Sequence, residues 1–257
     1  MRFIRFASLL LFASSVARDA LAEDLFEIQV FHARVTPQGT FGTELHSNYG
    51  AAGARVTPDG EASTKGVLFQ NVEPSYGVAR GFEIATHLQH AFRPDGTLDW
   101  GGAKLRAMYL LTPGVDGADG WHLAINAEGG YMPRRFDANR WGMEVRPVIE
   151  WTHGALDIDF NPMIAIPFGA ERPGVPELQP AVSTRYALAG VVSPSLEYYA
   201  QLGPVTGMPG IAGQRHYVFE TLDVIAWPHW ILHGGVGQGL TAASTKWIVT
   251  LLVGRLF

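Results

Sequence analysis

The last thirteen residues of the chain are Thr245-Lys246-Trp247-Ile248-Val249-Thr250-Leu251-Leu252-Val253-Gly254-Arg255-Leu256-Phe257. Side chains alternate between the two faces of a strand, so every second residue counted back from Phe257 lies on one face. From Trp247 to Phe257 that face is apolar except for Arg255, with an aromatic residue at each end. Since the ends of soluble strands usually fray, a terminal phenylalanine there contributes little. The stretch predicts a strand that closes a sheet.

The first 22 residues have the pattern of an export signal. Arg2 and Arg5 precede an apolar run over residues 6–16, and the small-x-small triplet Ala20-Leu21-Ala22 follows it. This order is typical of a signal peptide, here cleaved after Ala22. A membrane anchor is the alternative, but the run is too short to span a bilayer. We therefore expect residues 1–22 to be removed.

Composition narrows the class of protein. Without the signal the chain keeps 16 basic and 23 acidic residues, a net charge of −7, which argues against a nucleic-acid partner. The absence of cysteine excludes disulfides, thiolate metal sites and a lipoprotein anchor. After the signal no apolar run approaches the roughly 18 residues of a membrane helix. If the chain resides in a membrane, it must do so as a closed barrel.

From Thr40 onward polar and apolar residues alternate in segments separated by turn residues. We predict about twelve strands, an even number, which suits a single-chain bacterial barrel with both ends in the periplasm. The fold class is thus an all-β, antiparallel, transmembrane up-and-down β-barrel over residues 39–257, with residues 23–38 as an N-terminal periplasmic arm. The predicted strands are 40–49, 66–76, 82–92, 102–112, 120–131, 141–151, 155–166, 178–188, 195–203, 214–225, 230–238 and 245–257.

Aromatic residues recur at a spacing that matches a bilayer. Four pairs lie ten positions apart, hence on one face of their strands. Ten residues of a tilted strand rise about 25 Å, the height of the apolar band between two aromatic girdles. The predicted girdle residues are Phe82, Phe92, Trp121, Tyr131, Trp141, Trp151, Trp247 and Phe257. The alternative is a soluble barrel or sandwich with its apolar face inward.

The opposite faces of the strands carry the charged side chains. The predicted lumen-lining residues are Glu44, His46, Glu83, His87, Lys104, Arg106, His122, Glu128, Glu144, Arg146, Glu150, Asp157, Asp159, Arg185 and Glu197. Acidic groups outnumber basic ones among them, which predicts a negative field in the lumen that favours cations or neutral solutes. The alternative is that these charges brace a narrow, closed barrel.

Some features disagree with a regular barrel. Pro147 and Pro162 fall inside predicted strands, where each removes a hydrogen bond, so we expect bulges or strand ends there. Thr86 and His90 fall on the face that should contact lipid.

No catalytic, metal or cofactor site is expected. The adjacent His46 and Ser47 point to opposite faces, whereas a base and its nucleophile must share one. The glycines of Gly235–Gly239 precede a strand where a phosphate loop would need a helix, so we interpret them as a tight bend. His229 and His233 lie too far apart along a strand to share a metal. Asp157 and Asp159 are interpreted as solvated lumen carboxylates in preference to an acid–base pair.

Several short phrases resemble a known group of outer-membrane barrels. They are Gly39-Thr40-Phe41 before Glu44-Leu45-His46, Ser75-Tyr76-Gly77-Val78 before Glu83, Glu197-Tyr198-Tyr199-Ala200 before Leu202-Gly203-Pro204, and Val236-Gly237-Gln238-Gly239-Leu240-Thr241. Together with the terminal phenylalanine they are similar to outer-membrane transporter-like proteins grouped with the MetA pathway of phenol degradation in Gram-negative bacteria. The motifs are turns and strand edges and carry no chemistry.

The resemblance implies a passive channel in the outer membrane of a Gram-negative bacterium, passing small solutes that include aromatic or apolar compounds. It also implies outer-membrane lipid as surroundings and recognition of the last strand by the barrel-assembly machinery, although Arg255 departs from the usual hydrophobic residue at its position. Two alternatives stay open, a closed structural or lipid-binding barrel and a barrel enzyme acting on lipids.

Overall fold

The structure is a computed structural model that describes residues 24–56, 61–112, 118–137, 139–168 and 174–257. The predicted signal peptide lies outside these ranges. Within them one antiparallel sheet has thirteen strands. They are β1 Phe41–Ala52, β2 Leu68–Ala79, β3 Phe82–Phe92, β4 Leu98–Leu110, β5 Gly120–Tyr131, β6 Trp141–His153, β7 Leu156–Phe168, β8 Glu177–Tyr186, β9 Val192–Gln201, β10 Gly203–Pro204, β11 Arg215–Val224, β12 Trp230–Gly239 and β13 Trp247–Leu256. Among the described residues no helix is long and apolar enough to cross a membrane.

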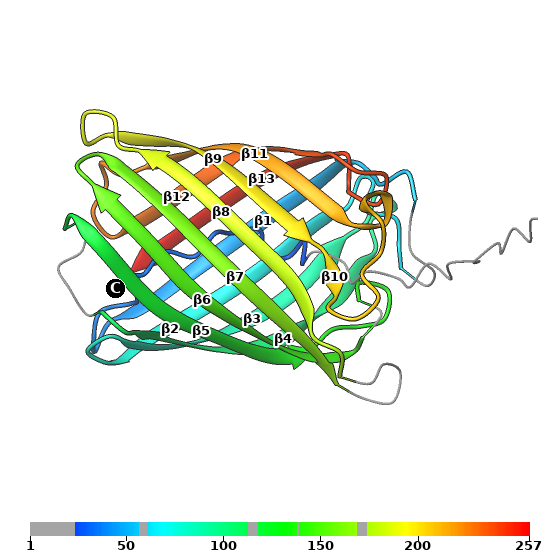
Figure 1. Ribbon diagram of the computed structural model, residues 1–257, viewed down its shortest axis with the longest axis horizontal. Coiled ribbons are helices and arrows are strands. Elements are labelled where there is room, and N and C mark those ends of the chain that lie inside the picture. Colours follow the sequence, from blue (N-terminus) through cyan, green and yellow to red (C-terminus); the bar gives the residue numbers. More distant parts are fainter. Residues whose placement is uncertain (1–23, 57–60, 113–117, 138, 169–173) are drawn as a thin grey trace, which may run out of the picture.

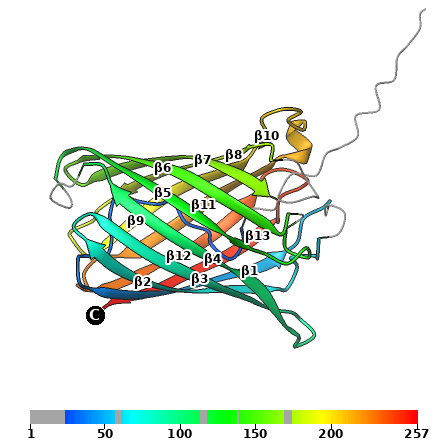
Figure 2. The same ribbon diagram turned by 90° about the horizontal axis from the view of Figure 1, so that it is seen from below.

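The sheet closes on itself as a barrel of oblique strands (Figure 1). β13 pairs with β1, and β9 pairs with both β8 and β11, while the two-residue β10 only extends the β8 pairing. The longer connections gather at one end, which we call the loop end, and Phe257 lies at the other, the C-terminal end (Figures 1 and 2). The twelve long strands confirm the predicted antiparallel barrel.

Side chains alternate between the outer surface and the interior, as β3 illustrates. Ile84 and Leu88 are exposed on the outside, whereas Glu83, His87 and Gln89 are buried inside. Closure gives the backbone groups of each long strand two neighbouring strands, so the sheet has no open edge. A barrel with charges inside and apolar side chains outside inverts the pattern of a soluble barrel.

The prolines interrupt hydrogen bonding without the bulge that we expected. Pro147 on β6 and Pro162 on β7 fall in the same gap, because the β6–β7 pairing lapses between Val145 and Ile149. The register is the same on both sides of the gap. A proline has no N–H to donate, so the pairing is lost locally while the strands stay aligned.

The glycine-rich stretch is strand and not a bend, so our interpretation of Gly235–Gly239 was wrong. These residues are the second half of β12. A Cβ at Gly237 would collide with the ring of Phe219 on the neighbouring strand β11. The glycine therefore makes room for an aromatic ring inside the barrel.

Residues 24–38 run inside the barrel from the loop end to the C-terminal end (dark blue in Figures 1 and 2), which corrects the predicted arm outside it. At the end of the segment a parallel bridge joins Gln38 to Gly77 of β2. The segment inserts because its apolar side chains find a core there: Phe26 packs with Phe69 and Phe219, and Phe31 with Met108 and Val148. The buried members from this segment are Leu25, Phe26, Ile28, Val30, Phe31 and Ala33.

Candidate functional site

The side chains predicted to line the lumen lie on the interior face of the strands. His46, Glu83, His87, Lys104, Arg106, Glu128, Arg146, Glu150, Asp159, Arg185 and Glu197 are buried there, and Glu44, Glu144 and Asp157 are half-buried. His122 is different, because its Nε2 lies 2.7 Å from the carbonyl oxygen of Ala118 in the preceding turn, at the rim of the C-terminal end.

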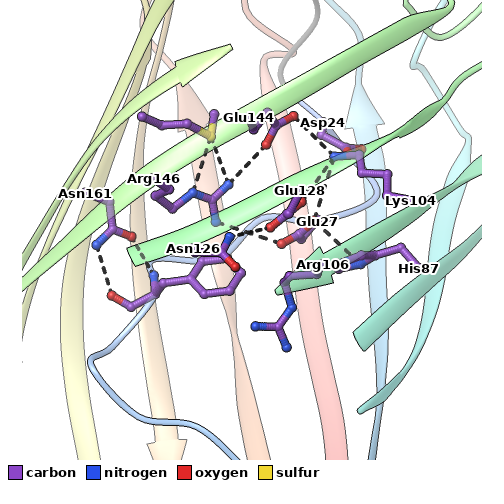
Figure 3. A network of polar contacts seen from close by, with 12 residues as sticks. Asp24, Glu27, His87, Lys104, Arg106, Asn126, Glu128, Glu144, Arg146 and Asn161 are labelled. Carbon is purple, nitrogen blue, oxygen red and sulfur yellow. Dashed lines mark hydrogen bonds and ion pairs between the residues drawn. The ribbon is translucent and has the colours of Figure 1, made fainter. Parts of the chain in front are cut away.

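Lys104 joins the inserted segment to the wall (Figure 3). Its Nζ lies 2.6 Å from Asp24 and 3.9 Å from Glu27 of the segment, and 3.3 Å from Glu144 and 3.7 Å from Glu128 of the barrel. A buried ammonium ion is costly unless it is paired, and here four carboxylates share it. Asp24 and Glu27 were not among the predicted site residues, because nothing in the sequence pattern indicated that their segment enters the barrel.

A second ion cluster lies toward the C-terminal end. The Nη2 of Arg106 lies 2.5 Å from Glu73 on β2 and 2.6 Å from Glu83 on β3. Glu73 also lies 3.1 Å from the Nε2 of His46. Glu73 was not predicted to line the lumen, although it shares the interior parity of its buried neighbours Asn71 and Ser75.

Side chains of the barrel wall form hydrogen bonds with the backbone of the inserted segment. The N–H of Phe31 donates to Asn161 Oδ1 at 2.7 Å, and Asn161 Nδ2 donates to the Phe31 carbonyl at 3.0 Å. The N–H of Ala33 donates to Glu150 at 2.8 Å, and Asn48 Nδ2 donates to the carbonyl of Leu25 at 2.8 Å. These contacts replace the strand pairing that the segment does not have.

The ring of Phe31 lies beside two guanidinium groups of the barrel wall. The guanidinium of Arg146 lies 4.2 Å from the ring centroid and that of Arg106 lies 5.4 Å from it. Both distances are within the range of cation–π attraction. The inserted segment thus places an aromatic ring among charged side chains of the wall, and not in a purely apolar environment.

Two cavities remain at the loop end, on either side of the segment. One, of about 100 Å³, is lined by Glu27, Glu128 and Asp137. The other, of about 330 Å³, is lined by Phe26, Phe69 and Phe136, whose rings meet edge to face at 5.1 to 6.1 Å. Small solutes could therefore enter from the loop end as far as the inserted segment.

Asp137, in the connection after β5, is the titratable group of this mouth. Burial raises the pKa of its carboxyl to about 7, and the negative charges of Glu61, Glu177 and Asp24 act in the same direction. The N–H of Asn139 donates to its Oδ1 at 2.7 Å. The charge at the mouth therefore changes near neutral pH.

The predicted girdle residues lie on the outer surface. Trp121, Trp141, Trp247, Phe92 and Phe257 are exposed, and Phe82, Tyr131 and Trp151 are half-buried. Strand pairing sets Trp121 beside Trp151 at one level and Tyr131 beside Trp141 at another. The aromatic residues of β5 and β6 thus form two rows ten residues apart.

Two polar residues on the outer face find partners there. The Thr86 hydroxyl donates to the Lys104 carbonyl at 3.0 Å, and the His90 Nε2 lies 3.2 Å from Gln70 Oε1. Gln70 in turn donates to the Ser47 hydroxyl at 3.0 Å, outside the barrel, whereas His46 is buried inside it. His46 and Ser47 are therefore not arranged as base and nucleophile.

Comparison with known proteins gives matches in structure alone. No family model and no curated protein matches the chain. It is similar to the COG4313 outer membrane channel from Pseudomonas putida F1, with a TM-score of 0.61 and 11% identity over 90% of this chain and 100% of that one. The shared fold is that of an outer-membrane β-barrel. The KdgM porin is also similar, with a TM-score of 0.54 and 9% identity over 84% of this chain and 98% of that one.

Proposed function

We propose that this chain is an outer-membrane channel for small solutes, and that residues 24–38 obstruct it in the conformation described here. One observation carries the proposal: a charged barrel interior surrounds a segment that is not part of the wall. The wall meets the segment's backbone and charges through hydrogen bonds and ion pairs, which water can replace at modest net cost. The fold shared with outer-membrane channels supports the same reading.

The outer surface supports placement in a membrane. Leu105 is 71% exposed on it, and Leu251 is 50% exposed, levels that contact with lipid would explain. The aromatic rows would lie at the two interfaces, and β13 would present Phe257 to the assembly machinery in the periplasm. Export through a signal cleaved after Ala22 belongs to the same proposal.

The cavity of about 330 Å³ at the loop end favours apolar or aromatic solutes. Phe26, Phe69 and Phe136 form its apolar part, and aromatic rings prefer such edge-to-face surroundings. The resemblance to barrels grouped with phenol degradation agrees with this class of solute.

The second candidate is a closed structural barrel, and a specific observation favours it as well. The inserted segment contributes buried residues to two hydrophobic clusters, which hold it more firmly than polar contacts alone would. A barrel enzyme acting on lipids has less support, because His46 and Ser47 face opposite sides.

Planar-bilayer recording separates the channel from the closed barrel. We expect small, intermittent conductance from the mature chain and a larger, steady conductance from a variant without residues 24–36. A heat-dependent shift in gel mobility would show that both are folded barrels. If the folded deletion variant conducts no ions, the channel proposal is wrong and the structural barrel stands.

A further inference from the structure

Three groups of one histidine and two carboxylates lie in the interior. They are Glu27, His87 and Glu128, then Glu44, His46 and Glu73, and finally His32, Glu150 and Asp159; in each group the possible ligand atoms lie within 4.8 Å of one another. Such clusters are common without an ion, so the surroundings of each group decide what it can bind.

Two of the groups already hold a cationic side chain of the protein. In the first, Lys104 Nζ lies 3.7 Å from Glu128 and 3.9 Å from Glu27, and Asn71 donates to His87 Nδ1 at 2.7 Å. In the second, Arg106 lies 2.5 Å from Glu73, and Glu73 also pairs with His46 Nε2. A metal ion would have to displace these partners.

The third group is different because, within the described residues, its central carboxylate and its histidine nitrogen are both left without hydrogen bonds. In the first group Glu27 also lacks them, but Asn71 already donates to His87 Nδ1. Asp159 is fully buried, and neither of its carboxylate oxygens accepts a hydrogen bond from the part of the chain that the structure describes. The nearest guanidinium nitrogen paired with it, Arg185 Nε, is 3.8 Å away. A buried carboxylate in this state is strongly destabilising unless a cation joins it.

His32 completes the geometry from the inserted segment. Its Nδ1 lies 3.0 Å from Asp159 Oδ1 and, like that oxygen, has no hydrogen-bond partner among the described residues. Ligand atoms around a tetrahedral zinc ion are roughly 3.3 Å apart, given bonds of about 2.0 Å. The side chain of His32 is 24% exposed, so an ion could reach it from the interior.

Glu150 supplies the third ligand atom from the wall. Its Oε2 accepts the N–H of Ala33 at 2.8 Å, which leaves Oε1 for an ion. Within the described ranges its Oε1 has long contacts, 3.4 Å to the Thr152 hydroxyl and 3.7 Å to Arg34 Nη2. Neither contact would prevent a metal ion from binding this oxygen.

We propose that His32, Glu150 and Asp159 bind a divalent transition-metal ion of the zinc class, with water completing its coordination. Imidazole nitrogen and carboxylate oxygen are ligands that Zn²⁺ accepts together. The ion would join the inserted segment to β6 and β7 and neutralise the two carboxylates. No metal was expected from the sequence, because nothing in it placed His32 beside these strands. The site is independent of whether the barrel conducts.

Metal titration of the mature chain, purified without a histidine tag and treated with EDTA, tests the site. We expect calorimetry to show one Zn²⁺ per chain, and Co²⁺ to give the visible absorption of a low-coordinate nitrogen and oxygen site. His32→Ala and Asp159→Asn should each weaken binding at least tenfold. His46→Ala is the matched control, since the nitrogen of His46 is already engaged by Glu73, and it should bind as the wild type does.

Limited proteolysis tests the link between ion and segment. Zn²⁺ should slow trypsin cleavage after Arg34, whose side chain is 44% exposed, several-fold in the wild type and not in His32→Ala. Absence of stoichiometric binding by the wild type, or unchanged binding by both ligand variants when gel mobility shows folded barrels, would overturn the proposal.

Discussion

Asn161 pairs with the main chain of Phe31 in both directions, accepting from its N–H at 2.7 Å and donating to its carbonyl at 3.0 Å. A side-chain amide thus does for one residue what a neighbouring strand would do. Both residues are buried, and no covalent bond joins the segment to the wall there. How firmly the segment is held depends on contacts of this kind, which single substitutions can remove.

Asn161→Ala should release the inserted segment more often. The two lost hydrogen bonds are each worth about 1 kcal/mol, so the displaced population should rise roughly thirtyfold. Open probability in planar bilayers is the measurement. The control is Asn126→Ala, because Asn126 is equally buried but donates to Glu128 on its own strand. Equal open probabilities for the two variants would contradict the prediction.

Glu144→Gln should lower the preference for cations over anions. Glu144 is half-buried beside the cavity that leads in from the loop end, so its charge acts on passing ions with little screening. The reversal potential in a salt gradient should shift toward zero, and less so at 1 M salt, where screening extends only about 3 Å. Glu220→Gln, an exposed carboxylate on the outer face, is the control and should leave the potential unchanged. An anion-selective wild type would refute the inward charge assignment.

The connection that carries Asp137 should open as the pH rises through neutrality. In the folded protein the pKa of the Asp137 carboxyl is raised from 3.8 to about 7. The protonated carboxyl therefore stabilises the ordered connection fully below pH 3.8, and this stabilisation is lost as the pH rises through about 7. Hydrogen exchange of a peptide spanning residues 132–137 should therefore be several-fold faster than in Asp137→Asn at pH 8 and similar at a pH below the ordinary pKa of 3.8. Comparing the two proteins at each pH cancels the intrinsic exchange rate. A pH-independent ratio would show that Asp137 does not control the connection.

Deleting Phe257 should impair barrel assembly. Its N–H donates to the carbonyl of Phe41 at 2.8 Å, and its ring lies 6.2 Å from that of Phe41 at the seam between the first and last strands. The amount of heat-modifiable protein in membranes should fall at least several-fold. Ile211→Ala is the control, because Ile211 is equally exposed, at 65%, but lies in the connection before β11. Similar amounts of folded protein from both would contradict a role for the terminal residue.

Gly237→Ala should destabilise the barrel. The added Cβ would collide with the Phe219 ring, and overpacking of this kind typically costs about 1–3 kcal/mol. The temperature at which the folded gel band disappears should drop. Gly210→Ala offers a control, because no atom of the described residues lies within 4 Å of a Cβ built there. If both variants melt like the wild type, the ring has room to move.

Much of the barrel followed from sequence because its signals are local. Alternation with a period of two shows which side chains share a face, and this alone predicted that Glu128, Arg146 and Glu150 lie inside and that Trp141 and Trp151 lie outside. Turn residues and strand lengths then predicted twelve strands, and most predicted ends lie within a few residues of those in the structure. β4 begins earlier than predicted, at Leu98.

The position of residues 24–38 was decided by the tertiary structure alone. An apolar, extended segment can contact lipid, lie outside a barrel or enter it. The outcome depends on the volume that the wall side chains leave free in the interior, and local sequence periodicity does not reveal that volume. Phe31 is buried because Asn161, Arg106 and Arg146, distant in sequence, converge on the same level of the interior. The group of His32, Glu150 and Asp159 exists for the same reason: parity placed the two carboxylates inside, and only insertion of the segment brought the imidazole to them.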